Sequence, residues 1–539
     1  MLRWPDATVH EALAGIADER PDRTAVVFEG RELSYADLLA RSRATARALS
    51  TCGVGEGDTV AVWLGNRPEW LTAQLGASMV GAAVVAVNTR YRAHELEYML
   101  ADSGCSLLLT ESEFLGRDYL DLLAEAVPGI DEPDPFPTDA FPDLDHVVAI
   151  EERPDYPGVT SHGAFVDAGA DASVEIDPAV DPLAPAAVFY TSGTTGDPKG
   201  CLQANRSLLN HSYAVGEHFG LDDSDVALGM MPFCGIMGYN AFLSALAHGV
   251  PLAVLTHFDA DRALDAIDEH GVTYASGTET MFARMLDSGE FDPSRVESFE
   301  RGAVFFSGGY DETTFERIEA GFGFPVVQPY GLSEANSQVF VGDPADPPDR
   351  RKRVGGPLVH PDEEEARIVD PETGEPVETG EAGELLLRGY NTMLGYHEKP
   401  EATAATVDDE GWLHTGDLAE RDADGYLYYR ARLDDALRVR GFLLTPRDVE
   451  RAVEAFDGVE RAQVVGVPHD RHGEVPVAFV VPAEATDEAT LLAFLDGRLA
   501  DYKLPDAVYF LDAFPTTEGP NGVKVQKSEL REMARERGS

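Results

Sequence analysis

Short apolar runs alternate with amphipathic stretches through about the first 400 residues of the chain. Residues 59–64 and 82–87 are apolar almost throughout, and between them residues 70–79 carry apolar side chains at helical spacing. An apolar run of this length is typical of a strand buried on both faces, and a strand, a helix and a second strand in succession form a β-α-β unit. The pattern therefore predicts a layered α/β domain.

Two more blocks of the same kind follow. Apolar runs at residues 251–255 and 272–275 flank an amphipathic stretch at residues 262–270. A third block contains apolar runs at residues 303–306 and 325–328. We therefore expect a large N-terminal α/β domain made of several subdomains.

The character of the chain changes after residue 344. Short apolar runs separated by glycine turns, such as residues 383–388 and 425–429, predict a small β subdomain. The last hundred or so residues are enough for a separate α+β domain. Its predicted elements are a helix at 446–455, strands at 462–467 and 475–481, a helix at 488–499 and a strand at 507–511.

A short polar junction at residues 432–435 separates these two parts. Polar composition and small length suit a hinge that absorbs a change of backbone angles. We therefore predict an N-terminal domain at residues 1–432 and a mobile C-terminal domain at residues 433–539.

The composition indicates a globular, strongly acidic protein. A chain of 539 residues is too long for one core, and 44% of its residues are apolar. The 96 acidic residues outnumber the 42 basic ones, and the net charge of −54 is spread along the sequence. Such a surface repels nucleic acid and anionic membranes, so neither is an expected partner.

Dispersed acidity with few lysines is typical of proteins that work in concentrated salt, where the screening length falls to about 3 Å. We infer the cytoplasm of a halophile. A docking surface for a basic partner is the alternative, but it would need a localised acidic block. Residues 131–145 come nearest to one, and we interpret them as a solvated loop.

The cysteines and the N-terminus point to a reducing compartment. Four cysteines without metal-ligand spacing are too few for a disulfide framework. The N-terminus lacks an apolar signal segment, and no run of eighteen uncharged apolar residues occurs. We predict a cytoplasmic protein without an integral membrane segment. The cysteines are Cys52, Cys105, Cys201 and Cys234.

A segment rich in glycine and hydroxyl groups, residues 190–200, follows an apolar run at residues 186–190 that predicts a buried strand. Glycine lets backbone N–H groups approach anions closely, and hydroxyls add donors. The segment predicts a loop for nucleotide phosphates, with a flexible surface loop as the alternative. Pro198 and Gly200 exclude a Walker A loop. The candidate residues are Thr191, Ser192, Gly193, Thr194, Thr195, Gly196 and Lys199.

Only six of the 42 basic residues are lysine, so the few positions that keep it are informative. Lysine presents a compact charge on a flexible stem, which suits one phosphate oxygen or a developing anion. Lys199 lies in the candidate phosphate loop and Lys524 lies near the C-terminus. Solvation of the surface is the alternative, and we apply it to Lys352 and Lys399.

Residues 190–200 resemble the phosphate loop of the adenylate-forming superfamily, which includes acyl-CoA synthetases, peptide-synthetase adenylation domains and beetle luciferases. Residues 520–531 resemble the closing motif of that family. The resemblance implies that Lys199 contacts the leaving phosphates of ATP. It also implies that Lys524 bridges the substrate carboxylate and the α-phosphate. The chain departs from the motif because Val523 is inserted before Lys524.

Residues 328–334 resemble the Tyr-Gly-x-Thr-Glu motif of the family. The resemblance implies that Tyr330 packs beside adenine, that the Ser333 hydroxyl meets the α-phosphate, and that Glu334 holds Mg²⁺, a hard cation that prefers carboxylate oxygens. Taken alone, the segment could be a turn that leads into a helix. The same candidate nucleotide site includes Gln328 and Gly331, and also Gly308, Gly309 and Tyr310 in a segment that resembles the family's loop beside adenine.

Residues 411–418 and 429–442 resemble two motifs that lie near the domain junction in the family. The resemblance implies that Asp417 and Arg432 bind the ribose hydroxyls and that Asp434 is the pivot of the hinge. Taken alone, these segments would pass for a β-turn and a solvated pair of strands. The implied residues at the tunnel for the pantetheine of coenzyme A are Arg440, Gly441 and Phe442.

Residues 230–242 and 276–281 offer Met, Phe and Tyr side chains but no aspartate to hold an amino group, which favours a fatty or aryl acid over an amino acid. Cys234 stands where many relatives carry histidine. A cysteine nucleophile is one interpretation, but no histidine partner is identifiable nearby, and we favour a pocket-wall or core cysteine. The candidate acid-binding residues are Cys234, Gly235, Met237, Tyr239 and Gly277.

The resemblance implies an AMP-forming acyl-CoA synthetase that uses ATP, Mg²⁺ and coenzyme A. A carboxylate attacks the α-phosphate, pyrophosphate leaves, and a thiol then displaces AMP. Coenzyme A is the preferred thiol because no carrier domain follows the last motif before Ser539. The alternatives are an adenylation enzyme that loads a carrier protein, a luciferase-like oxygenase and a noncatalytic protein that binds nucleotide or acid. The oligomeric state stays open, with a homodimer as one option.

The dispersed negative charge generates a first prediction. Self-repulsion among the carboxylates should destabilise the fold at low ionic strength, and concentrated KCl should screen it. We expect the thermal unfolding midpoint to rise as KCl is raised from 0.1 M to 2 M, measured by the change of intrinsic fluorescence on heating. A midpoint that is highest in the most dilute buffer would contradict the halophile interpretation.

Overall fold

The computed structural model places two compact units, which consist of Met1–Glu365 with Leu387–Leu413 and of Ala366–Leu386 with His414–Ser539. We call them the first and the second unit. The predicted class, a large α/β part and a smaller α+β part, is confirmed. The structure describes residues 3–133, 135–170, 176, 179–191, 198–305, 312–439, 442–444, 446–469, 473–496, 498–501, 503–519 and 522–537.

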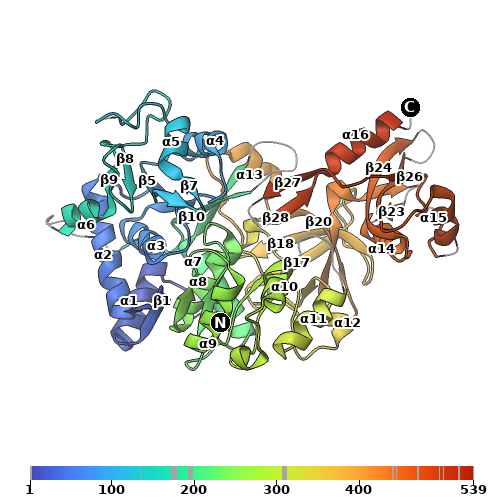
Figure 1. Ribbon diagram of the computed structural model, residues 1–539, viewed down its shortest axis with the longest axis horizontal. Helices are drawn as coiled ribbons and strands as arrows, with labels where there is room; N and C mark the ends of the chain where they lie inside the picture. Colours follow the sequence, from blue (N-terminus) through green and yellow to red (C-terminus); the bar gives the residue numbers. More distant parts are fainter. Residues whose placement is uncertain are drawn as a thin grey trace. The chain divides into compact units, whose positions relative to one another are not determined.

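An eight-stranded sheet forms the centre of the first unit, with strand order β19-β11-β10-β4-β3-β5-β8-β9 (Figure 1). The strands from β10 to β9 in this order are parallel, whereas β11 and β19 add an antiparallel edge. Apolar side chains throughout β3 and β4 match their burial on both faces, as the pattern predicted. The strands are β3 (Thr59–Trp63), β4 (Ala83–Ala86), β5 (Leu107–Thr110), β8 (His146–Ala149), β9 (Thr160–Ser161), β10 (Pro185–Thr191), β11 (Lys199–Ala204) and β19 (Gly395–Tyr396).

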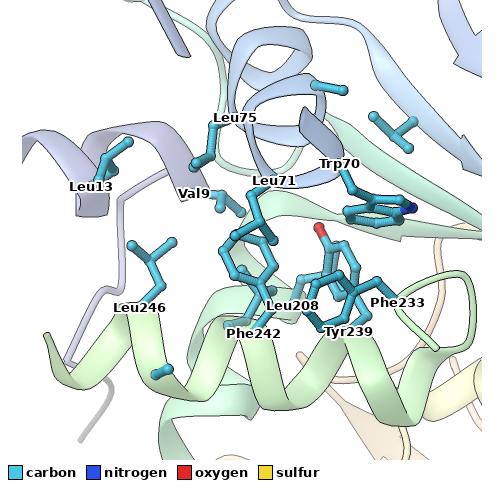
Figure 2. Packing of buried hydrophobic residues seen from close by; sticks show 14 of the residues in the cluster. Val9, Leu13, Trp70, Leu71, Leu75, Leu208, Phe233, Tyr239, Phe242 and Leu246 are labelled. Carbon is cyan, nitrogen blue, oxygen red and sulfur yellow. The ribbon is translucent and has the colours of Figure 1, made fainter. Parts of the chain in front are cut away.

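Helix α3 (Pro68–Val80) joins β3 to β4 and is buried along almost its whole length. Figure 2 shows Trp70 and Leu71 of this helix facing Tyr239 and Phe242 of α8 (Ile236–His248). The ring centroids of Trp70 and Tyr239 lie 5.6 Å apart in an edge-on contact. A helix that is apolar on all sides needs partners on all sides, which here are the sheet and the helices α1 (Val9–Glu19), α2 (Tyr35–Thr51), α7 (Asn205–His218) and α8.

A second sheet of the first unit has the order β12-β13-β1-β2. The predicted strands at 272–275 and 325–328 do not form. Isolated β-bridges form instead. Tyr274 bridges to Ala227 and to Arg301, and Val327 bridges to Ala303. Nearby lie β1 (Thr24–Phe28), β2 (Arg31–Ser34), β12 (Ala227–Gly229), β13 (Leu252–Val254), β14 (Gly277–Thr278), β15 (Val304–Phe305), α9 (Ala260–His270), α10 (Glu279–Asp287) and α11 (Glu312–Phe322).

Shorter elements complete the first unit. They are α4 (Ala93–Ser103), β6 (Glu113–Phe114), β7 (Arg117–Asp118), α5 (Tyr119–Ala126), α6 (His162–Ala170), η1 (Pro293–Val296), η2 (Ser333–Ala335), α12 (Pro348–Arg351), β16 (Gly355–Gly356) and α13 (Pro400–Thr406). Of the helices that the structure describes, none is both long and apolar enough to cross a membrane.

The second unit contains the antiparallel pair β20 (Leu413–Arg421) and β21 (Leu427–Arg432), followed by η3 (Leu433–Asp435). Strands β17 (Glu364–Val369) and β18 (Ala382–Gly389) carry the chain into and out of this unit. The predicted hinge residue Asp434 lies in η3 and is exposed.

The C-terminal residues follow the predicted order of helix, strand, strand, helix and strand. Strands β22, β23, β27 and β28, which are three or four residues long, and the last helix were missed. The elements are β22 (Leu437–Val439), β23 (Phe442–Leu444), α14 (Pro446–Glu454), β24 (Val459–His469), β25 (Gly473–Pro482), α15 (Glu488–Leu495), β26 (Ala507–Phe510), β27 (Thr516–Gly519), β28 (Gly522–Val525) and α16 (Lys527–Arg537).

Candidate active site

The candidate phosphate loop closes an antiparallel hairpin. Thr191 at the end of β10 pairs with Lys199 at the start of β11, and the Thr191 hydroxyl donates a 3.4 Å hydrogen bond to the Lys199 carbonyl. A Walker A loop leads from a strand into a helix, so the strand that follows here agrees with its exclusion. The predicted residues Ser192, Gly193, Thr194, Thr195 and Gly196 lie outside the described residues.

Lys199 differs from the other lysines whose side chains the structure describes. Its ammonium nitrogen lies 5.1 Å from the centroid of the Tyr396 ring, and within the described part of the chain it pairs with no carboxylate. The other four each bind one, in the pairs Lys352–Glu316, Lys399–Asp102, Lys503–Asp448 and Lys527–Glu450. A lysine left without a carboxylate in so acidic a protein is a candidate ligand for phosphate.

Glu334 lies in η2, a short 3₁₀ turn held on both sides. The carbonyl of Ser333 accepts a 2.6 Å hydrogen bond from the Gln203 side chain, and the carbonyl of Glu334 accepts one of 2.8 Å from the backbone of Met393. The Tyr396 hydroxyl donates to the Glu334 carboxylate at 2.9 Å. Glu334 and Lys199 therefore both contact one aromatic side chain.

Three buried residues directly after this turn adopt left-handed backbone angles. The φ values are 60° at Asn336, 63° at Ser337 and 40° at Gln338. Left-handed angles outside glycine cost of order 1 to 3 kcal/mol each and persist only where the surroundings impose them. A Cβ at Gly331 would lie 2.2 Å from the Gln338 nitrogen, which explains the glycine of the Tyr-Gly-x-Ser-Glu sequence.

Buried hydrogen bonds hold these left-handed residues. The side chain of Asn336 donates to the carbonyl of Asn391 at 2.9 Å, and Nε2 of His211 donates to the carbonyl of Ser337 at 2.7 Å. The other ring nitrogen of His211 lies 3.1 Å from Glu364. The fully buried His211–Glu364 pair thus holds the residues that directly follow the turn carrying Glu334.

Tyr330 and Gln328 lie two positions apart along the chain but differ in their contacts. The Tyr330 ring stacks on Phe340 with centroids 5.4 Å apart. Gln328 is buried, and its amide nitrogen donates to the carbonyl of Lys352 at 2.7 Å. The predicted residues Gly308, Gly309 and Tyr310 lie outside the described residues.

In the second unit, Asp417 and Arg432 lie directly opposite each other on β20 and β21. The guanidinium of Arg432 contacts the Asp417 carboxylate at 3.0 Å, and Asp417 is only 4% exposed. Burial, together with the Asp417 charge, raises the pKa of the neighbouring Tyr429. The pair that the sequence singled out for the ribose hydroxyls is therefore brought together.

Residues of the C-terminal motif lie in the hairpin β27–β28, where Lys524 pairs with Thr517 through the backbone. The side chain of Lys524 lies outside the description, as does that of Phe442, and Arg440 and Gly441 are not among the described residues. Lys527, three residues later, binds the buried Glu450 at 3.3 Å. Lys527 therefore anchors the last helix.

The candidate acid-binding residues divide into two groups. Cys234, Gly235 and Met237 are partly exposed at the start of α8. Tyr239, by contrast, is 0% exposed and lies in the core against Trp70, so it contributes packing and no accessible surface. Gly277 is also buried, and a Cβ there would lie 2.4 Å from the end of Met230.

Burial raises the pKa of the Cys234 thiol. A thiol that stays protonated is a poor nucleophile, since the thiolate is the reactive form. The structure therefore favours a wall residue over a catalytic cysteine.

Comparison with known proteins identifies the family. The family model described as AMP-binding enzyme matches residues 13–397, and the model of the AMP-binding enzyme C-terminal domain matches residues 448–519. The chain belongs to the AMP-binding enzyme family. No boundary of either match falls at the predicted junction, residues 432–435, which stays a prediction.

Several relatives of this AMP-binding enzyme are similar over almost their whole length. A (7a-methyl-1,5-dioxo-octahydroinden-4-yl)propanoyl:CoA ligase of Mycobacterium tuberculosis is 35% identical, covering 98% of this chain and 99% of the relative. The 2-succinylbenzoate–CoA ligase of Bacillus velezensis is 30% identical, covering 95% and 96%. The ATP-bound MatB structure from Rhodopseudomonas palustris has a TM-score of 0.80 at 28% identity, covering 98% and 99%.

The structure adds candidate site residues of the AMP-binding enzyme that the sequence did not indicate. Tyr396 is the main one, because it contacts both Lys199 and Glu334. Cys201 is another: burial, together with the nearby Glu334 carboxylate, raises the pKa of its thiol. No local motif marks either residue, since Tyr396 is separated from Glu334 by 62 positions. Only the pairing of β19 with β11 places Tyr396 opposite Cys201.

Proposed function

We propose that this protein activates a carboxylic acid with ATP and transfers the acyl group to coenzyme A, releasing AMP and pyrophosphate. The observation that carries the proposal is the placement of Lys199 and the half-buried Glu334 around Tyr396, beside the hairpin that ends in the candidate phosphate loop. Among the described residues, no carboxylate pairs with the Lys199 amine. The full-length similarity to several CoA ligases supports it.

In the first step an oxygen of the acid forms a bond to the α-phosphorus, and the bond from that phosphorus to the bridging oxygen of pyrophosphate breaks. This displacement requires no nucleophile from the protein. Lys199 would neutralise the leaving phosphates, and Lys524 would bridge the carboxylate and the α-phosphate. Fixed charges placed where negative charge develops can supply most of the rate enhancement.

The donors around Glu334 fit Mg²⁺ of the kind that nucleotides carry. The described residues contain no group of three metal-ligating side chains, and Mg²⁺ in nucleotide sites needs only one or two carboxylates because phosphates and water fill the other positions. Glu334 would hold the ion. When bound, Mg²⁺ supplies positive charge that stabilises the phosphate oxygens.

The nucleoside would be held by other residues. The two carboxylate oxygens of Asp417 can each accept a hydrogen bond, which suits the two ribose hydroxyls, and Arg432 would orient that carboxylate. Tyr330, stacked on Phe340, offers a flat neighbour for adenine. Gly308, Gly309 and Tyr310 complete the proposed adenine loop.

In the second step the sulfur of coenzyme A bonds to the acyl carbon, the bond from that carbon to the phosphate oxygen breaks, and AMP leaves. We propose that the segment with Arg440, Gly441 and Phe442 lines the path of the thiol. Rotation about Asp434 would replace Lys524 by this segment between the two steps, so that one active site serves both.

A fatty or aryl acid is the proposed substrate class. The partly exposed Cys234 and Met237 are apolar and uncharged. The names of the relatives include a 2-succinylbenzoate ligase and a medium-chain acyl-CoA ligase of Rattus norvegicus, 29% identical. We also propose the cytoplasm as the compartment, since all four cysteines are free.

The deciding experiment is a panel of fatty, aryl and amino acids, assayed for AMP formation in concentrated KCl with and without coenzyme A. We expect fatty or aryl acids to support AMP release that depends on coenzyme A. Pyrophosphate exchange without such release would favour an enzyme that loads a carrier protein. ATP binding without any turnover would favour a noncatalytic protein.

The proposed role of Lys524 predicts a selective loss. Lys524→Ala should slow adenylation at least about a hundredfold, since removal of one transition-state donor commonly costs that much. Acid-dependent pyrophosphate exchange measures this step. Lys503→Ala is the matched control, because that lysine belongs to the same unit and binds Asp448 at 3.3 Å. Equal exchange rates in wild type and Lys524→Ala would refute the role.

The proposed hinge predicts that Asp434→Pro leaves adenylation detectable while thioester formation collapses, because proline fixes φ. The carbonyl of Asp434 accepts a hydrogen bond from Arg531 at 3.1 Å, and that carbonyl remains in proline. Single-turnover assays of each step measure the two effects, with Asp434→Ala as the control that keeps φ free. An equal loss of both steps would defeat the hinge.

A further inference from the structure

Tyr396 lies at the edge of the eight-stranded sheet and contacts two oppositely charged residues. Its ring faces the Lys199 amine at 5.1 Å, and its hydroxyl donates to Glu334 at 2.9 Å. Lys199 and Glu334 form no ion pair with each other among the described contacts. Both charges therefore contact Tyr396, one at its ring face and the other at its hydroxyl.

The other lysines show which partner a lysine amine usually has in this acidic chain. Acidic residues outnumber basic ones by 96 to 42, and each of the four other lysines with a described side chain binds a carboxylate. Attraction between an amine and a half-buried carboxylate is stronger than at the open surface, because water screens it less. Loss of Tyr396 would remove the side chain that both Lys199 and Glu334 contact.

Hydrogen bonds to two different elements hold the strand that carries Tyr396. The Tyr396 N–H donates to the Thr403 hydroxyl at 2.9 Å, and the N–H of His397 donates to the carbonyl of Gly200 at 2.7 Å. A Cβ at Gly395 would lie 2.9 Å from Thr403, so the strand packs closely on the following helix. These contacts fix the ring relative to β11, the strand that begins with Lys199.

The hydroxyl of Tyr396 donates its hydrogen bond to an oxygen of the Glu334 carboxylate. A protonated phenol offers Glu334 a hydrogen bond that adds no charge to the site. The aromatic face offers Lys199 a weak cation–π attraction, which a phosphate can replace.

We propose that Tyr396 is a positioning residue that keeps Lys199 and Glu334 from neutralising each other, so that the amine stays available for phosphate and the carboxylate for Mg²⁺. This inference rests on the proposed function and adds a residue to it. It explains why one tyrosine binds both charges by different parts of its side chain.

The test compares two substitutions that remove different contacts. Tyr396→Phe keeps the ring face for Lys199 and removes the hydroxyl from Glu334. Tyr396→Leu removes both, which leaves Lys199 and Glu334 free to pair. ATP affinity is measured by calorimetry with and without Mg²⁺, in concentrated KCl, and the thermal unfolding midpoint of each variant shows that it is folded.

For Tyr396→Phe we expect the gain in ATP affinity on adding Mg²⁺ to fall about tenfold, while the affinity without Mg²⁺ stays near that of wild type. A tenfold loss is the size expected when a charged group loses a hydrogen bond. For Tyr396→Leu we expect both affinities to fall. Tyr156→Phe is the matched control, since the Tyr156 hydroxyl donates to Asp121 at 2.7 Å and belongs to no proposed site.

A double-mutant cycle separates positioning from mere structural support. If Tyr396 prevents an ion pair, Tyr396→Leu should lower the Mg²⁺-free ATP affinity much less in a Glu334→Gln background, where no ion pair can form. Equal losses in both backgrounds would overturn the proposal, as would a Tyr396→Phe variant with the same Mg²⁺ effect as wild type.

The binding and activity measurements also distinguish a failure of the proposed function from a failure of the role of Tyr396. Wild-type protein that binds ATP more tightly with Mg²⁺ but activates no acid would refute the proposed function, and the cycle would still decide the role of Tyr396. Wild-type protein that activates an acid but whose ATP affinity does not depend on Mg²⁺ would overturn the role of Tyr396 and leave the proposed function standing, because the carboxylate would then have no ion to hold.

Discussion

The antiparallel edge of the eight-stranded sheet is the constraint on which the candidate site depends. Strand β11 pairs with β10 on one side and with β19 on the other. The first pairing sets Lys199 opposite Thr191, and the second brings Tyr396 next to both Lys199 and Glu334. Backbone hydrogen bonds on a sheet fix positions far better than a loop does, because each residue is held from two sides.

A second constraint fixes the position of the Glu334 carboxylate. Asn336, Ser337 and Gln338 keep left-handed angles that none of them would prefer in isolation, and the buried His211 and its neighbours hold them there. Such a segment has little freedom to relax, because each of the three residues bonds to a different part of the first unit. Strain of this kind is typical of sites whose geometry matters more than their stability.

The sequence predicted those parts of the fold that follow from local pattern. The apolar runs of β3 and β4 and the periodicity of α3 are as expected, because burial on both faces leaves a clear signal. Residues 272–275 form only a bridge at Tyr274, since pairing depends on the neighbouring strands and not on apolar content alone. Tyr239 was expected at a pocket and lies in the core, because α8 is apolar on nearly all sides. Lys199 and Glu334 could be named as candidate site residues from their motifs, whereas Tyr396 could not, because its partners come from pairings between distant segments.

The path of the chain has a consequence for synthesis. Residues 366–386 leave the first unit and residues 387–413 return to it, bringing the strand that closes the sheet edge. While the protein is being made, the ribosome must therefore release nearly 400 residues before β11 gains its outer neighbour. Until then the edge presents unpaired backbone groups, the feature of β proteins most prone to wrong association, and the high acidity of the chain provides repulsion between nascent copies.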